Sequence, residues 1–307
     1  MKIILVVNPK SGRGTGHKLC VELGNELRFR GHNIEVVRIG SDAIVGDIFV
    51  ARIESAHRIV VIGGDGTVHH LLPVLSGLET PMYHLGTGTA NLIAHEFGMS
   101  KNPKIVADHL EQNIEPFFAD LPTCNGIPFL LMVSVGIDAS VIHRLEKISS
   151  KKRGYRAYIK PVLQELRSPR IGRTSLCINN DEHFKIQQQT VVISNCKSYG
   201  GGFNPSPKAK PNDHKLHVAI IPMKTSIGAF FQFVFLKLKL SKLMGVQHDI
   251  CNQISVVTEE TVHVQVDGEQ ASSIPGLSDG KLGPRIKLKI SSSTAPKLAI
   301  HVPNTHE

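Results

Sequence analysis

The sequence predicts a chain of the α/β plus β class, in which an N-terminal doubly wound α/β domain precedes a C-terminal antiparallel β-sandwich domain. Its length of 307 residues is typical of two domains at roughly 100–200 residues each. Strand-like and helix-like segments alternate over about the first 120 residues, as in a parallel sheet covered on both faces. From about residue 117, apolar runs without helical periodicity follow one another, which favours an antiparallel sandwich.

We therefore expect an α/β domain at residues 1–120, a sandwich domain at 121–290 and a tail at 291–307. In the first domain, strands are expected at 3–7, 33–39, 58–62 and 81–85, with helices at about 18–30, 42–54 and 68–75. In the second, strands are expected at 129–137, 174–179, 190–194, 216–221, 254–258 and 262–266, with more strand at 285–290 and 298–302. Helical inserts are expected at 139–166 and 226–244.

Composition excludes several classes of protein. Hydrophobic residues make up 41% and charged residues 20%, which argues against disorder, and no apolar run reaches the roughly 18–20 residues of a membrane-spanning helix. The apolar run at the N-terminus is too short for a secretion signal, so we expect a soluble, cytoplasmic protein. The five cysteines form no Cys-x-x-Cys pair and the 16 histidines no His-Glu-x-x-His, which speaks against disulfide or zinc frameworks.

The net charge of +9 predicts an anionic partner, and a nucleotide, a nucleic acid or an anionic membrane surface would each fit. Aromatic residues make up only 5% of the chain and tryptophan is absent, which leaves little to stack against single-stranded bases. No recognised nucleic-acid-binding module occurs in the sequence. We therefore expect no nucleic-acid partner.

The segment Gly63, Gly64, Asp65, Gly66 and Thr67 carries the strongest functional signal. Its glycines let the backbone turn sharply after a buried strand, and the helix that follows presents its N-terminal N–H groups to an anion. Because Asp65 would repel a phosphate unless a cation lay between them, the loop predicts a Mg²⁺-nucleotide with the metal near Asp65. An ordinary strand-to-helix turn in which Asp65 caps a helix is the alternative.

Two further loops follow strands at the same carboxyl edge of the predicted sheet, where open α/β sheets bind ligands. One, at residues 86–91, offers the hydroxyls of Thr87 and Thr89 and the amide of Asn91. The other consists of Asn8, Pro9, Lys10, Ser11 and Gly12. Together the loops predict a site for nucleotide phosphates, whereas His17 disrupts the spacing of both the dinucleotide-binding and the Walker A patterns.

In the second domain, Asp267 and Glu269 flank Gly268 directly after an expected strand, so a turn would present two carboxylates together. A positioned carboxylate can accept the proton of an alcohol that attacks a γ-phosphoryl group. A plain hairpin turn is the alternative, because Asp-Gly is a favoured turn dipeptide.

Seven segments, taken in order, resemble the diacylglycerol/sphingosine lipid kinase family, particularly its compact bacterial members. They are Asn8-Pro-Lys-Ser-Gly12, Gly63-Gly-Asp-Gly-Thr67, Gly86-Thr-Gly-Thr-Ala-Asn91, Asp120-Leu-Pro-Thr-Cys-Asn-Gly126, Ser134-Val-Gly-Ile-Asp138, Asn204-Pro-Ser-Pro with Asp213, and Val266-Asp-Gly-Glu269. The resemblance spans nearly the whole chain. It implies an α/β nucleotide domain, a β-sandwich domain on the lipid side, ATP and Mg²⁺ as cofactors, and a C-terminal tail that returns to the first domain.

The resemblance also implies roles for single residues. Glu269 would accept the proton of the lipid hydroxyl, Asp267 would support it, and Asp120 would belong to the active-site network. Asp213 would hold a structural Mg²⁺, but this chain has Asp213-His-Lys-Leu-His217 where the family has Asp-Gly-x-Leu-Asp. Ser41, after the second strand, would contact the nucleotide.

The function that the resemblance implies is an ATP- and Mg²⁺-dependent lipid kinase, which transfers the γ-phosphoryl group to a hydroxyl of a membrane lipid such as diacylglycerol. An NAD kinase and a non-catalytic lipid- or nucleotide-binding protein are the alternatives. The basic segments 148–155 and 230–242 would either touch lipid at the inner face of the membrane, as in peripheral binding, or pack in a core. Whether the lipid is diacylglycerol, a sphingoid base or phosphatidylglycerol stays open, as does a homodimer.

Overall fold

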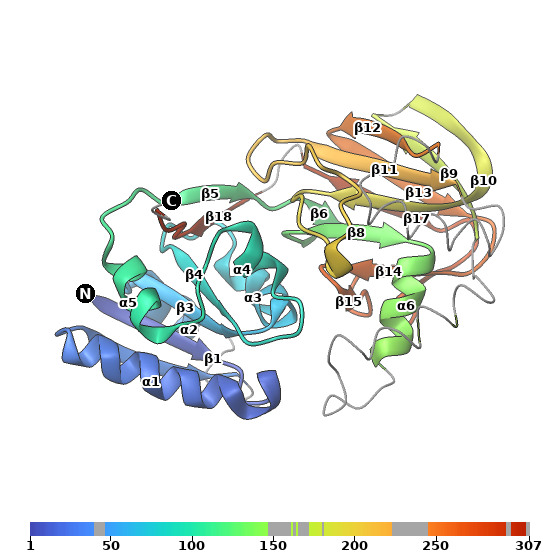
Figure 1. The fold of residues 1–307 in the computed structure, drawn as a ribbon. Coiled ribbons are helices and arrows are strands. Elements are labelled where there is room, and N and C mark those ends of the chain that lie inside the picture. Colours follow the sequence, from blue (N-terminus) through green and yellow to red (C-terminus); the bar gives the residue numbers. More distant parts are fainter. Residues whose placement is uncertain are drawn as a thin grey trace. The chain divides into compact units, whose positions relative to one another are not determined.

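The computed structural model describes residues 1–39, 47–146, 161, 164, 172–179, 181–222, 245–292 and 296–304. The chain divides into two units (Figure 1). Unit 1 comprises Met1–Ala119 and Pro296–Glu307, and unit 2 comprises Asp120–Ala295. Unit 1 contains a parallel sheet with helices and unit 2 contains antiparallel strands, so the predicted α/β plus β class is confirmed.

Unit 1 is built on a sheet with the strand order β2-β1-β3-β4-β18-β5. Its strands are β1 (Lys2–Val7), β2 (Asn33–Arg38), β3 (Arg58–Gly63), β4 (Met82–Gly86), β5 (Phe117–Asp120) and β18 (Lys297–Ile300). The pairs β1–β2, β1–β3, β3–β4 and β4–β18 are all parallel, so the C-terminal segment of the chain completes the sheet of the N-terminal unit. Parallel strands covered on both faces are apolar throughout, as the buried residues of β1 show.

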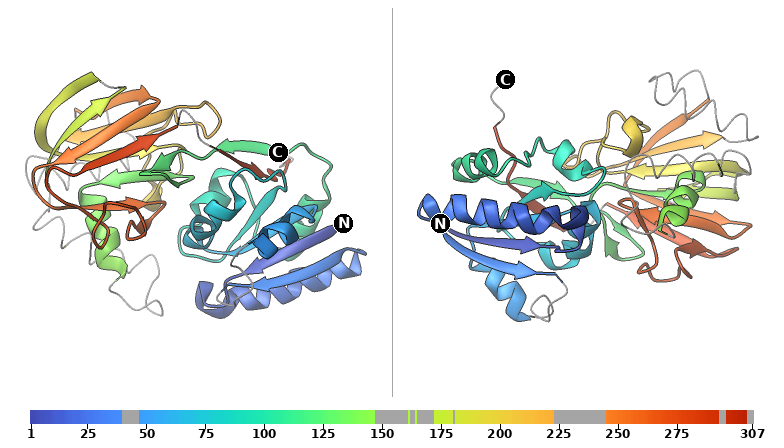
Figure 2. Two further views of the ribbon diagram at one scale, coloured as in Figure 1. Left: turned by 180° about the vertical axis from the view of Figure 1, so that it is seen from behind. Right: turned by 60° about the horizontal axis from the view of Figure 1, so that its bottom comes forward.

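Helices cover both faces of this sheet (Figures 1 and 2). They are α1 (Thr15–Phe29), α2 (Asp47–Glu54), α3 (Asp65–Leu75), α4 (Leu92–Glu96) and α5 (Pro103–Glu111). On one face, α1 and α5 bury Leu23, Leu27 and Val106 against Leu5 of β1. Helix α1 ends at Phe29, and the chain turns away at Gly31, which has a left-handed conformation (φ +86°) and whose N–H donates to the carbonyl of Arg28.

Unit 2 contains antiparallel strands and, among its described helical residues, the α-helix α6. They are β6 (Thr123–Cys124), β7 (Ile127–Pro128), β8 (Met132–Val135), α6 (Ile137–Glu146), β9 (Arg173–Ile178), β10 (Asp181–Ser194), β11 (Leu216–Pro222), β12 (Gln247–Cys251), β13 (Gln253–Thr258), β14 (Val262–Val266), β15 (Glu269–Gln270), β16 (Lys281–Leu282) and β17 (Lys287–Ser291). Strand β10 pairs with different neighbours along its length: its first part pairs with β9, and its second part pairs with β8 and β11.

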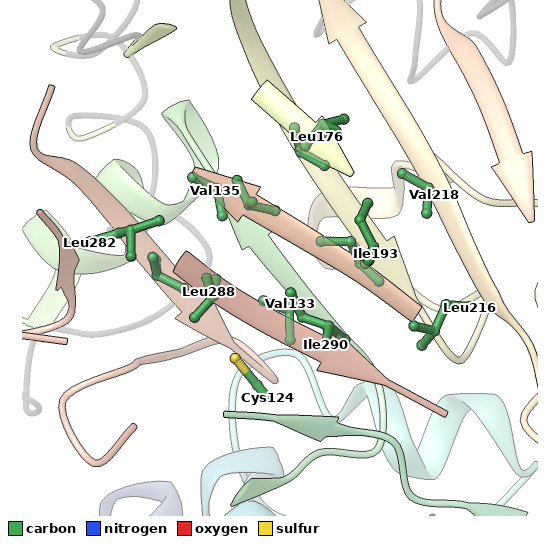
Figure 3. Packing of buried hydrophobic residues seen from close by; sticks show 14 of the residues in the cluster. Cys124, Val133, Val135, Leu176, Ile193, Leu216, Val218, Leu282, Leu288 and Ile290 are labelled. Carbon is green, nitrogen blue, oxygen red and sulfur yellow. The ribbon is translucent and has the colours of Figure 1, made fainter. Parts of the chain in front are cut away.

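A large apolar core lies in the described part of unit 2 (Figure 3). Val133 and Val135 of β8 lie in it beside Ile193 of β10, and Leu288 and Ile290 come from β17. Inward residues alternate along these strands, as expected of sheets with one face on a core. This packing holds the ends of β8 and β14, where the acidic turn described below is located.

Several expected boundaries were wrong. Helix α3 begins at Asp65 and not at residue 68, because Gly64 has an extended backbone (φ −89°, ψ 179°) and starts the helix inside the glycine-rich loop. The strand expected at 190–194 is 14 residues long, and the strand expected at 129–137 is only Met132–Val135. The insert expected at 139–166 begins as α6 at Ile137, and residues 147–160 and 226–244 lie outside the described residues.

Candidate functional site

The carboxyl ends of β1, β3 and β4 bring three glycine-rich loops together in unit 1. The backbone N–H of Asn8 donates to Ile62 at 3.0 Å, which sets the first loop beside the end of β3. The N–H of Thr87 donates to the carbonyl of Gly63 at 2.7 Å, which sets the third loop beside the second. The loops that the sequence placed at one sheet edge therefore form one continuous surface.

Side chains of the first loop connect it to the other two. Ser11 Oγ and Thr87 Oγ1 lie 2.8 Å apart, and Asn8 Nδ2 donates to Thr67 Oγ1 at 3.1 Å. Asn8 Oδ1 also accepts the N–H of Lys10 at 3.0 Å, so this one amide shapes its own loop and holds the next. Of the two threonines in the third loop, Thr87 makes the contact with the first loop, whereas Thr89 is exposed.

Glycines permit this close approach of backbones. A Cβ on Gly12, whose φ is +60°, would lie 2.5 Å from the carbonyl oxygen of Thr87 and 2.3 Å from Thr15 Oγ1. A Cβ on Gly88 would lie 2.9 Å from the Cα of Gly64. Side chains at these positions would push the loops apart, so the glycines shape the surface as well as exposing its backbone.

Asp65 connects the second loop to α4. Its Oδ2 accepts the N–H of Leu92 at 2.9 Å, and its Oδ1 accepts the N–H of Ile93 at 3.0 Å. The carboxylate therefore caps a helix, as the alternative interpretation held, but the helix is α4 and not the α3 that Asp65 itself begins. Magnesium near Asp65 stays a prediction, and the carboxylate is half-buried with a protein hydrogen bond on each oxygen.

The third loop is closed by Asn91, and His84 of β4 supports the neighbouring second loop at Gly63. Asn91 adopts a left-handed conformation (φ 49°, ψ 48°), and its side chain accepts the N–H of Gly88 at 2.7 Å and donates to the Gly88 carbonyl at 3.0 Å. His84 is fully buried, with Nε2 3.0 Å from the carbonyl oxygen of Gly63. Burial lowers the pKa of His84, so the imidazole that supports the second loop is neutral at pH 7.

These loops can bind the phosphates of a nucleotide. In the first turn of α3, the N–H of Thr67 donates to the carbonyl of Gly64 at 2.9 Å, whereas the N–H groups of Asp65 and Gly66 come too early in the helix to have an acceptor within it. Residues 64–66 are half-buried. Pro9 and Lys10 of the first loop are exposed, and Lys10 adds a positive charge. Ser41 lies outside the described residues.

In unit 2, Asp267 and Gly268 form a two-residue hairpin turn between β14 and β15. Their φ angles are +52° and +83°, and Val266 pairs with Glu269 across the turn. Positive φ at both central residues is the geometry of a type I′ turn, for which Asp-Gly is a preferred sequence. The turn places Glu269, which is half-buried, at the first position of β15.

The carboxylate of Asp267 is buried and serves the backbone. Its Oδ1 accepts the N–H groups of Leu131 and Met132 at 2.7 and 3.0 Å, and its Oδ2 accepts that of Leu130 at 3.0 Å. These bonds occupy the N–H groups of residues 130–132, and β8 begins at Met132 instead of at residue 129 as expected. Asp267 was predicted to support Glu269 chemically, and in the structure its contacts hold the turn that carries Glu269.

Asp120 and Asp213 each pair with a histidine at a position where the sequence departs from the family pattern. Asp120 is 2% exposed, and His214 donates to it from its backbone N–H at 2.8 Å and lies at 2.9 Å through Nδ1. Asp213 Oδ2 lies 2.9 Å from His217 Nε2, and its Oδ1 accepts the N–H of Lys215 at 3.0 Å. Both carboxylates thus have protein partners, and the described residues include no cluster of three or more acidic, histidine or cysteine side chains suited to a metal.

The sequence analysis did not predict a buried polar network next to the acidic turn. Asp138, at the start of α6, accepts hydrogen bonds from Ser134 and from the hydroxyl of Tyr199, the latter at 2.5 Å. Burial raises the pKa of Asp138 and, together with this carboxyl, that of Tyr199. The sequence feature that could have indicated this network is a polar residue within an apolar strand. Ser134 in β8 and Gln265 in β14 are such residues.

Comparison with known proteins identifies both units. The family model for the diacylglycerol kinase catalytic domain matches residues 2–118, and that for the YegS C-terminal NAD kinase beta sandwich-like domain matches residues 131–289. The chain is 29% identical to a diacylglycerol kinase of Mycobacterium tuberculosis over 279 residues, which cover 87% of this chain and 86% of that one. It is also 29% identical over 231 residues to a protein of Pseudomonas aeruginosa described as YegS-like lipid kinase, with 72% of each chain covered.

Solved structures share the fold. A crystal structure from Bacillus anthracis str. Sterne, assigned to the diacylglycerol kinases, matches with a TM-score of 0.73 at 20% identity, covering 99% of this chain and 95% of that one. These matches identify the protein as a kinase. Its sequence contains a glycine-rich α/β unit and a unit with an acidic hairpin. The chain belongs to the family of diacylglycerol kinases and YegS-like lipid kinases, as its motifs predicted.

Proposed function

We propose that this protein transfers the γ-phosphoryl group of ATP to a hydroxyl of a membrane lipid, with diacylglycerol as the first candidate acceptor. The kinase class makes ATP the expected donor, and the relative from Mycobacterium tuberculosis carries the name diacylglycerol kinase. The observation that supports this proposal most is the joining of three glycine-rich loops at the carboxyl ends of β1, β3 and β4.

The ATP phosphates would lie against these loops. Backbone N–H groups of residues 63–67, at the start of α3, would hold phosphate oxygens, and the loop from Asn8 to Gly12 would enclose them. Thr89 is exposed beside this surface and would donate its hydroxyl. Close backbone contact is what the glycines at positions 12, 64 and 88 permit.

Mg²⁺ would arrive with the nucleotide and would be held largely by phosphate oxygens and water, as is common for this ion. Asp65 is the carboxylate that the sequence places near this ion, and both of its oxygens already accept backbone hydrogen bonds. When bound, the ion would neutralise charge on the phosphates. A cation at Asp213 is less well supported, because His217 Nε2 already lies 2.9 Å from one carboxylate oxygen.

Glu269 would accept the proton of the lipid hydroxyl. The bond between the γ-phosphorus and the bridging oxygen breaks, a bond from the hydroxyl oxygen to phosphorus forms, the proton passes to Glu269, and ADP leaves. A half-buried carboxylate at the rigid end of a type I′ turn suits this role. Asp267 would keep that turn in place.

The acceptor would be met at a membrane surface by peripheral contact. The described residues contain no helix that could cross a bilayer, and the net charge of +9 supports attraction to anionic lipid. The basic segments 148–155 and 230–242, which were predicted to face lipid or the core, lie outside the described residues.

The test is transfer of label from γ-labelled ATP, with Mg²⁺, to micelles of diacylglycerol, a sphingoid base or phosphatidylglycerol, and to NAD. Label on a lipid with wild-type protein, reduced by about 10²–10⁴-fold in Glu269→Gln, is the expected result. Glu259→Gln is the matched control, since Glu259 pairs with Arg173 at 2.8 Å at the other end of β14. Label on NAD, or full activity of Glu269→Gln, would contradict the proposal.

A further inference from the structure

Two buried polar side chains face each other in the middle of apolar strands of unit 2. Ser134 of β8 and Gln265 of β14 are direct partners in the antiparallel pairing, and they are 0% and 2% exposed. Their neighbours Val133, Val135, Val264 and Val266 all belong to the apolar core. A buried polar pair costs stability unless every group is satisfied, so these residues are expected to have partners of their own.

The partners form a continuous chain that ends at the acidic turn. Gln265 Oε1 accepts the N–H of Gly268 at 2.7 Å, and Gln265 Nε2 donates to Ser134 Oγ at 2.9 Å. Ser134 donates its hydroxyl to Asp138 Oδ2, and Tyr199 donates to the same oxygen at 2.5 Å. The chain therefore runs from Tyr199 to the peptide that precedes Glu269.

The direction of each bond is fixed by chemistry. The N–H of Gly268 can only donate, so the amide oxygen of Gln265 must face it and the amide nitrogen must face Ser134. Ser134 accepts that hydrogen and can then use its own proton only toward the carboxyl of Asp138. The amide of Gln265 thus has one favoured orientation. Asp138 orients the hydroxyl of Ser134, Ser134 orients the amide, and the amide oxygen then accepts the N–H of Gly268 in the turn.

The turn does not need this network in order to form. Asp-Gly adopts a type I′ turn by itself, and Asp267 already binds the three N–H groups of residues 130–132. The bond from the N–H of Gly268 to Gln265 adds a second restraint, one residue before Glu269. Such a restraint limits the position of the Glu269 backbone to a narrow range.

We propose that Gln265, oriented by Ser134, Asp138 and Tyr199, is a positioning residue that fixes Glu269 for proton transfer. This inference rests on the proposed function, in which Glu269 accepts the hydroxyl proton. Displacement of a catalytic group by about 1 Å can cost about 10²-fold in rate. Loss of the Gln265 amide should therefore reduce kcat and leave the binding of ATP unchanged.

The experiment compares Gln265→Leu with Gln189→Leu in the lipid kinase assay. Gln189 is a matched control, because it is also fully buried in the same unit and donates two hydrogen bonds, at 2.9 and 3.2 Å, to Thr174. We expect kcat of Gln265→Leu to fall at least about 10-fold below that of Gln189→Leu, with KM for ATP within about 2-fold of wild type. Equal kcat values for the two variants would overturn the inference.

A double mutant separates this inference from the proposed function. If Gln265 acts through Glu269, Gln265→Leu should lower kcat no further in the Glu269→Gln background. A fall of the same factor in both backgrounds would overturn the positioning role, whereas full activity of Glu269→Gln alone would overturn the proposed function. If Gln265→Leu does not fold, Ser134→Ala breaks the same chain with a smaller change, and an unchanged kcat in that variant would overturn the inference.

Discussion

The glycine-rich loop of unit 1 and the acidic turn of unit 2 both use an aspartate, and they use it in similar ways. Asp65 accepts two backbone N–H groups from α4, and Asp267 accepts three from residues 130–132. The difference lies in burial: Asp65 is half-buried, whereas Asp267 is 2% exposed. Asp65 can therefore meet a ligand in addition to its structural contacts, whereas the carboxylate of Asp267 is fully occupied.

The comparison indicates how the two sites divide their chemistry. In each, the aspartate shapes the loop, and a different group is left to meet the ligand. Under the proposed function, that group would be the backbone at the start of α3 in unit 1 and Glu269 in unit 2. An aspartate in such a loop therefore does not by itself indicate that it binds a metal or transfers a proton.

The largest effect is expected for Asp267→Asn. An asparagine must turn its NH₂ group toward backbone N–H donors or leave them unpaired in a buried site, so we expect a loss of about 3 kcal/mol in the free energy of unfolding. Urea denaturation measures it, with the exposed Asp279→Asn, whose side chain is 67% exposed, as the control. A loss below about 1 kcal/mol would show that the Asp267 clamp is unimportant.

The next effect is expected for Gly12→Ala. Its Cβ would meet the Thr87 carbonyl oxygen at 2.5 Å, so the change should cost about 2 to 3 kcal/mol and weaken ATP binding. Gly14→Ala is the matched control: Gly14 also has a positive φ, of +92°, but a Cβ there would meet nothing within 4 Å, so only about 1 kcal/mol is expected. Equal losses in the two variants would mean that the crowding between the loops has no effect.

A smaller effect is expected for Asp65→Asn. The half-buried site loses charge-assisted bonds to Leu92 and Ile93, and about 1 to 2 kcal/mol should be lost from the free energy of unfolding. Thermal or urea unfolding without nucleotide reports this structural part. Calorimetric titration with Mg²⁺-ATP then tests the added ligand role, and unchanged affinity would restrict Asp65 to capping α4.

How much of this could be predicted from the sequence depends on the distance between partners. The loops, their order and the Asp-Gly-Glu turn are local patterns, so the sequence predicted them together with the fold class. The partners of Asp65 lie 27 and 28 residues away, and those of Asp267 more than 130. No local pattern reports such contacts, and the same holds for the chain from Tyr199 to Gln265.

The smallest effect is a dependence of stability on pH that arises in unit 1. Burial lowers the pKa of His84 below its ordinary 6.5, so the unfolded chain binds this proton more readily than the folded one. The contribution of the neutral His84 imidazole to the free energy of unfolding is fully present above pH 6.5, and it is lost as the pH falls below that value. His84→Gln should reduce proton uptake on unfolding between pH 7 and 5 by up to about one proton, a slope of about 1.4 kcal/mol per pH unit. Urea unfolding at several pH values measures this slope, and an unchanged slope would contradict the assignment.

The most direct test of the division between the two sites is the kinetic comparison of Glu269→Gln with Gly12→Ala, using labelled ATP and diacylglycerol micelles. We predict that Glu269→Gln lowers kcat by about 10²–10⁴-fold and leaves KM for ATP near the wild-type value. Gly12→Ala should instead raise KM for ATP about 10-fold, with a much smaller change in kcat. If Glu269→Gln acted mainly on KM for ATP, or Gly12→Ala mainly on kcat, the assignment of nucleotide binding to unit 1 and of proton transfer to unit 2 would be contradicted.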